Sequence, residues 1–120
     1  DIEIPLRPLQ KALYFLFLRH PEGIRLSDIG NYRDELEDLY SLVIPNRDYE
    51  LMQTSLDLLT DPMNTESLRQ QLSKIKRTVC ARIISDDMAK NYYISGDRGK
   101  AYKVPLDRRK VEMPPALTIY

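Results

Sequence analysis

The sequence predicts one domain of the α+β class, in which amphipathic helices precede a basic helix and a β-hairpin. Three observations carry this prediction: the chain length, a basic helix-forming segment that starts near residue 64, and two β-type segments after it. With 120 residues, the chain is long enough to bury one core but not two. We expect residues 1–111 to form the domain and residues 112–120 to be a tail or linker.

The basic helix begins with a recognisable signal. Asn64 and Thr65 are small polar capping residues, and Glu66 places an acid in the first turn. After them, apolar residues recur every three or four positions and predict one narrow buried stripe: Leu68, Leu72, Ile75 and Val79. Basic and polar residues occupy the other faces. We expect this helix to end between residues 81 and 84.

Two β-type segments follow the basic helix, Tyr92–Ile94 and Ala101–Val104. The intervening residues, Ser95–Lys100, contain two glycines and an aspartate, which is typical of a turn, and they also carry charge. We therefore expect a β-hairpin whose loop presents Arg98 and Lys100.

The first half of the chain predicts a short strand and several helices. Ile2–Ile4 alternates in polarity and is followed by Pro5, as in an edge strand. Pro8 suits the first turn of a helix that ends near Arg19. Its expected buried face is Leu9, Ala12, Leu13, Leu16 and Phe17.

Further helices are expected between residues 27 and 59. Ser27 and Asp28 offer a cap for a second helix, which Gly30 interrupts early. Helical periodicity returns from Tyr32 to about Val43, and residues 47–59 are consistent with one more short helix.

Charge is unevenly distributed along the chain. Residues 1–63 contain six Lys/Arg and twelve Asp/Glu, which gives −6, whereas residues 64–120 contain twelve and six, which gives +6. Such asymmetry suggests an anionic partner for the basic half. The alternative is that the two halves neutralise each other within one domain.

Four stretches of the chain follow a known pattern, namely residues 8–23, 26–28, 68–76 and 93–104. They resemble the first helix with its closing turn, the start of the second helix, the recognition helix and the wing of the winged-helix effector domain of OmpR/PhoB-type response regulators. The resemblance covers about residues 2–106 and implies a winged helix-turn-helix fold that binds DNA in transcriptional control. Ala101 stands where the family usually has glycine, and residues 32–63 are longer than the corresponding part of the family.

Double-stranded DNA is the partner that this pattern predicts. A recognition helix needs cations toward phosphates and donors toward base edges. The helix supplies both, and the hairpin loop adds cations beside it. The expected DNA-binding residues are Arg69, Gln70, Ser73, Lys74, Arg77, Arg98 and Lys100.

The alternative function is a protein-interaction or homo-oligomerisation module, because a fold does not by itself determine function. The working surface would then be an acidic row on the helix near residue 36 or the apolar end of the chain. The residues of this alternative site are Asp34, Glu35, Glu37, Asp38, Leu117, Ile119 and Tyr120.

Nothing in the sequence favours an enzyme, a metal site or a cofactor. His20, the only histidine, follows a helix end, where we expect it to cap carbonyl groups rather than to act as a base. The single Cys80 excludes an internal disulfide; a buried structural thiol is the common case, and nearby cations leave a reactive thiol as an alternative. With one cysteine and no internal disulfide, we expect a cytoplasmic location. No signal peptide is recognised, but the chain starts at Asp1 without a methionine, as a processed product or an excised domain that has lost its signal would.

Overall fold

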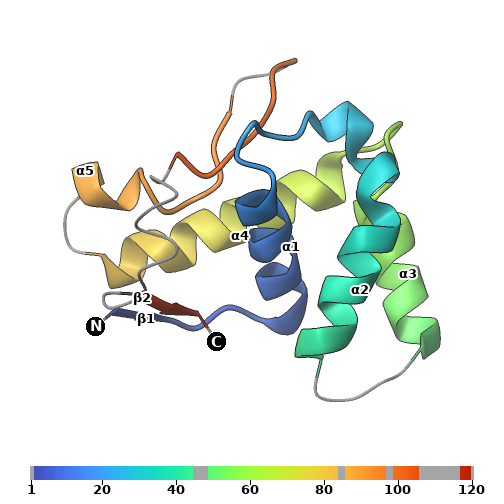
Figure 1. Cartoon of the computed structure of the whole chain (residues 1–120), viewed down its shortest axis with the longest axis horizontal. Helices are drawn as coiled ribbons and strands as arrows, with labels where there is room; N and C mark the ends of the chain where they lie inside the picture. The colour runs from blue at the N-terminus through green and yellow to red at the C-terminus, as the bar shows by residue number, and fades with distance from the viewer. Residues whose placement is uncertain (1, 45–48, 84–85, 97–98, 106–116, 120) are drawn as a thin grey trace.

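The computed structural model describes residues 2–44, 49–83, 86–96, 99–105 and 117–119. Helices dominate the described residues (Figure 1). In chain order the elements are strand β1 (Ile2–Ile4), helix α1 (Pro8–Arg19), a 3₁₀ helix η1 (Leu26–Tyr32), helices α2 (Arg33–Val43), α3 (Tyr49–Leu59), α4 (Glu66–Arg82) and α5 (Asp86–Ala89), and strand β2 (Leu117–Ile119).

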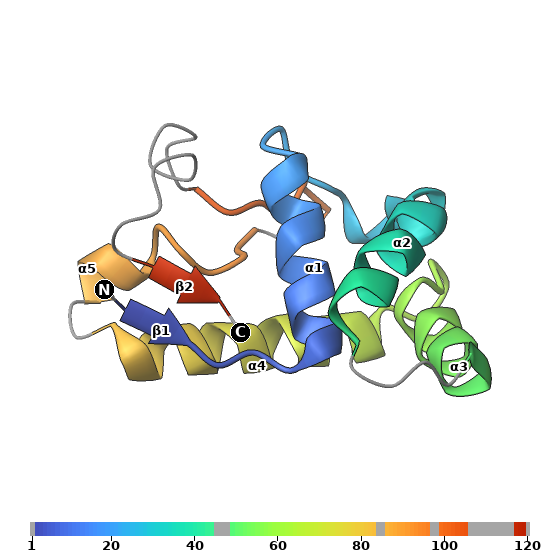
Figure 2. The same ribbon diagram turned by 60° about the horizontal axis from the view of Figure 1, so that its bottom comes forward.

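The long helices form where hydrophobic periodicity predicts them. Pro8 occupies the first turn of α1, and Phe17 and Leu16 on its inner face are fully buried. Leu9, which we expected to be buried, is only partly so, whereas Tyr14 is buried. In both views α1 crosses α4, while α2 and α3 lie side by side near one end of α4 (Figures 1 and 2). The core lies between these helices.

Helix α4 confirms the predicted apolar stripe. Its buried residues are Leu68, Leu72, Ile75 and Val79. The Asn64 side-chain oxygen accepts a hydrogen bond from the backbone N–H of Glu66 at 3.2 Å, so Asn64 satisfies one of the free donors of the first turn. The helix ends at Arg82, within the predicted range, and leaves a wide polar face on the surface.

The predicted α+β class with a C-terminal β-hairpin wing is wrong, because the chain is mostly helical and the described residues after α4 form no hairpin of regular strands. The backbone groups that such a strand would need are used elsewhere. The N–H of Tyr92 donates to the carbonyl of Ala89, and the carbonyl of Tyr92 accepts from the Tyr14 hydroxyl. In the part of this segment that the structure describes, two isolated bridges form instead, Ser95 with Lys103 and Tyr102 with Ile24.

The segment before α2 also differs from expectation. Ser27 and Asp28 do not cap an α-helix but lie within η1, which starts at Leu26 and continues through Gly30. The α-helical hydrogen-bond pattern begins only at Arg33, close to the Tyr32 start that periodicity indicates.

The two strands bring the ends of the described chain together. Strand β2 runs parallel to β1, with Ile2 opposite Leu117 and Ile4 opposite Ile119. Residues 117–119 of the expected tail therefore pair with the first strand (Figure 2). Among the described residues, no helix combines the length and apolar content needed to cross a membrane.

Candidate nucleic-acid interface

Helix α4 presents two parallel rows of polar side chains beside its buried stripe. Residues spaced by four and then three positions lie on one face of a helix. We call Arg69, Ser73 and Lys76 the cleft row, because they border the cleft described below, and Gln70, Lys74 and Arg77 the outer row. All six side chains are exposed. The structure therefore places five predicted DNA-binding residues on one continuous surface.

Among the residues that the structure describes, no carboxylate forms an ion pair with the cations of these two rows. Every described ion pair joins residues from the same half of the chain: Arg19 and His20 with Glu35, His20 with Glu22, Arg33 with Asp57, and Lys90 with Asp87. The Arg69 side chain donates instead to the Thr65 hydroxyl at 3.1 Å. Within the described residues, the acidic half forms no ion pair with α4.

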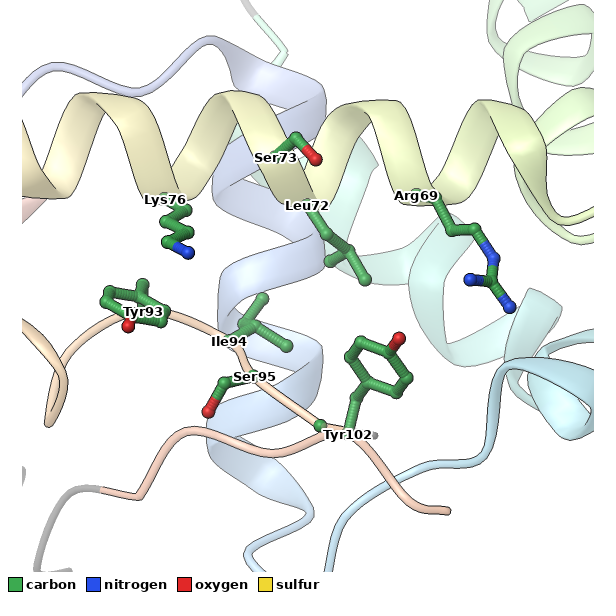
Figure 3. A pocket seen from close by; sticks show the side chains of 9 residues that line it. Arg69, Leu72, Ser73, Lys76, Tyr93, Ile94, Ser95 and Tyr102 are labelled. Atoms are coloured by element: carbon green, nitrogen blue, oxygen red, sulfur yellow. The ribbon is translucent and has the colours of Figure 1, made fainter. Parts of the chain in front are cut away.

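A cleft of about 270 Å³ separates the cleft row from the chain that follows α5. Figure 3 shows Arg69, Leu72 and Lys76 reaching from α4 toward Tyr93, Ile94 and Tyr102. The Lys76 ammonium lies 5.0 Å from the centre of the Tyr93 ring, within the range of a cation–π contact. The full lining is Arg69, Leu72, Ser73, Lys76, Tyr93, Ile94, Ser95, Gly96 and Tyr102.

A buried tyrosine holds the wall of this cleft. The Tyr14 hydroxyl, on α1, donates to the carbonyl oxygen of Tyr92 at 2.5 Å. Burial, and to a lesser extent Tyr92, raises the pKa of Tyr14 above its usual range, so the hydroxyl keeps its proton and remains a donor. Sequence reasoning missed Tyr14, Lys76, Tyr93 and Tyr102, because only the path of the chain brings them together. The i, i+7 spacing from Arg69 was the one available signal, and it points to Lys76.

Of the two cations predicted in the hairpin loop, the structure describes Lys100 but not Arg98. Lys100 is exposed. Arg98 lies outside the described residues, so its expected contact with DNA beside the helix stays a prediction.

The acidic row of the alternative site is divided by the fold. The Glu35 carboxylate forms an ion pair with Arg19 and a hydrogen-bonded ion pair with His20. The Glu37 carboxylate accepts a hydrogen bond from the side chain of Gln53 on α3. Asp34 and Asp38 are exposed. Leu117 and Ile119 form part of β2, and Tyr120 lies outside the described residues. Two of the four carboxylates thus join helices within the protein.

His20 joins the end of α1 to α2 through carboxylates, and the expected capping of carbonyls by its ring is wrong. Its ring nitrogens lie 3.1 Å from a Glu22 oxygen and 2.9 Å from a Glu35 oxygen, and the ring packs edge-on against Tyr32. Desolvation lowers the pKa of His20, but the hydrogen bonds and charges of Glu35 and Glu22 outweigh it, so the pKa is raised.

We expect this cluster to make stability depend on pH. A raised pKa in the folded state means that the stabilisation is fully present below the unfolded pKa of about 6.5 and is lost as pH rises through the folded pKa. The melting temperature of the wild type minus that of His20→Gln should therefore decrease between about pH 6 and pH 8. A difference that stays constant over this range would contradict the prediction.

The exposure of the Cys80 thiol and the spacing of possible metal ligands can both be described. The expected burial of Cys80 is wrong, because its thiol is free and exposed on α4. In the described part of the chain, no three His, Cys, Asp or Glu side chains are grouped closely enough to hold a metal ion.

Helices α2 and α3 each carry an exposed leucine. Leu42 is 81% exposed and Leu58 is 58% exposed, although both lie in amphipathic helices. Single exposed leucines are ordinary on protein surfaces.

Comparison of the chain with protein-family models, with curated proteins and with solved structures found no match.

Proposed function

We propose that the protein binds double-stranded DNA through the exposed face of α4. The observation that carries the proposal is the absence, among the described residues, of any ion pair between the acidic half of the chain and the cations of α4. Unpaired surface cations on one helix face are the feature that phosphate binding requires, since affinity comes mainly from neutralised phosphates.

The outer row has the chemistry of a groove-binding surface. Gln70 and Arg77 are seven residues apart, which is about 10 Å along the helix. The major groove of B-DNA, about 12 Å wide, admits an α-helix. Arg and Gln side chains can pair bidentately with guanine and adenine edges, and Lys74 suits a phosphate. The cleft row lies beside it, where a DNA backbone would pass.

The test is a fluorescence-anisotropy titration of the full chain with a random-sequence duplex at two salt concentrations. Non-specific affinities are typically about 10⁻⁴ to 10⁻⁶ M, and log K falls with log salt by about 0.9 for each neutralised phosphate. For four cations, Arg69, Lys74, Lys76 and Arg77, we expect an about hundredfold loss of affinity for an about fourfold rise in salt.

No binding at low salt would overturn the proposal, because the non-specific electrostatic component is the first to appear. Sedimentation of the same samples tests the protein-interaction alternative. A concentration-dependent dimer that is lost in Asp34→Lys/Asp38→Lys, together with no DNA binding, would favour that alternative.

A further inference from the structure

The cleft beside α4 differs chemically from the outer row. Its lining includes two largely buried apolar side chains, Leu72 and Ile94, and the two tyrosines Tyr93 and Tyr102. A bare phosphate gains nothing from an apolar lining. A planar ring that carries an anion gains affinity from such a lining, because the ring packs on the apolar and aromatic groups while the anion contacts Arg69 or Lys76.

The cleft is small. Pockets that enclose a drug-sized ligand measure about 300–1,000 Å³, and this cleft, at about 270 Å³, is just below that range. This volume is compatible with one nucleotide.

Tyr102 is already fixed in the position that such a ligand needs. Its backbone exchanges two hydrogen bonds of 2.8 Å with Ile24. Its side chain packs against Gly96, where an added Cβ would lie 2.8 Å from the Tyr102 Cγ. Figure 3 shows the ring directed toward α4, beside Leu72 and Arg69. A ring held in this way loses little conformational entropy when a base stacks on it.

We propose that this cleft binds one unpaired nucleotide, with the base against Tyr102 and the phosphate at Arg69 or Lys76. The nucleotide comes either from a free mononucleotide or from a single-stranded nucleic acid. This inference does not rest on the proposed duplex binding: Arg69 and Lys76 would serve both ligands, but only the unpaired nucleotide would use Tyr102.

The experiment compares three probes on the full chain: thymidine monophosphate by calorimetry, and a labelled oligothymidylate of about ten nucleotides and a blunt duplex by anisotropy. Tyr102→Leu removes the aromatic ring but keeps apolar bulk, and Tyr102→Phe is the matched control. Stacking on one aromatic side chain is strong enough that we expect Tyr102→Leu to weaken oligothymidylate binding about tenfold, and Tyr102→Phe by less than about twofold. Duplex affinity should stay within about twofold in both variants.

The probes distinguish the two sources. Tyr102-dependent binding of both thymidine monophosphate and the oligothymidylate supports a site for a free nucleotide, and such binding of the oligothymidylate alone supports a strand. The proposal would be overturned if the wild type and Tyr102→Leu bound the oligothymidylate with equal affinity. It would also be overturned if Tyr102→Leu lost as much affinity for the duplex as for the oligothymidylate, or if neither thymidine monophosphate nor the oligothymidylate bound. Oligothymidylate binding without duplex binding would overturn only the duplex proposal.

A second variant covers the case in which Tyr102→Leu does not fold. Gly96→Ala places a Cβ 2.8 Å from Cγ and 2.9 Å from the backbone Cα of Tyr102, so Tyr102 must shift, and the variant replaces no cation. The same selective loss of oligothymidylate affinity is expected, and unchanged affinity would count against the site.

Discussion

The double variant Lys74→Glu/Arg77→Glu is expected to lose DNA binding while remaining folded. Both side chains are exposed on the outer row and have no described ion-pair partner, so their replacement removes two phosphate or base contacts and adds two repulsions. We expect duplex affinity at low salt to fall by about hundredfold or more, and the salt dependence to weaken by about one unit of slope for each lost phosphate contact. Anisotropy titrations at several salt concentrations measure both quantities.

Arg82→Glu is the matched control for this charge reversal. Arg82 is exposed on the same helix but lies outside both rows, so the variant changes net charge without removing a proposed contact. Its effect on affinity should be smaller than that of either Lys74→Glu or Arg77→Glu alone. Each surface change should alter the free energy of unfolding by less than about 0.5 kcal/mol. Equal losses in all three single variants would mean that net charge, and not the outer row, controls binding.

The variant Phe17→Ala is expected to have the largest effect on stability. Phe17 is fully buried on α1, the helix that packs most extensively against α2 and also contacts α4. Replacing a buried phenylalanine by alanine removes apolar burial and leaves a cavity, which together cost about 3–5 kcal/mol. Because domains of this size are stable by only about 5–15 kcal/mol, we expect a large decrease in the urea midpoint.

Leu42→Ala provides the comparison for this core variant. Leu42 is 81% exposed near the end of α2, so its truncation should change the free energy of unfolding by less than about 0.5 kcal/mol. A loss of more than about 2 kcal/mol in Leu42→Ala would contradict the exposure of this leucine. A loss below about 1 kcal/mol in Phe17→Ala would contradict the burial of Phe17 in the core.

Local sequence patterns are enough to predict the long helices and their inner faces. Helix α4 starts at Glu66 and buries Leu68, Leu72, Ile75 and Val79, as its spacing predicts. The periodicity of a helix is local, so four residues within three turns are enough to identify the buried side. The rows of α4 follow from the same geometry, and for this reason the predicted residues Arg69, Lys74 and Arg77 lie together.

The segment after α4 depended on tertiary contacts. Tyr92 and Tyr93 have the β-type character of a strand, but the fold uses the Tyr92 carbonyl to accept the hydroxyl of Tyr14, 78 positions earlier. Tyr102 pairs with Ile24, which is equally distant in the chain. No local pattern contains these partners. Local patterns therefore predict a β-hairpin in a segment where the fold forms isolated bridges beside a cleft.

Tertiary structure also decided which charges are free. A row of carboxylates looks the same in the sequence whether it faces solvent or a neighbouring helix. Glu35 and Glu37 are occupied by His20 and Gln53, because α1 and α3 pack on either side of α2, whereas the α4 cations meet no described carboxylate. Side-chain chemistry is local, but the partner of a charge is set by how the helices pack.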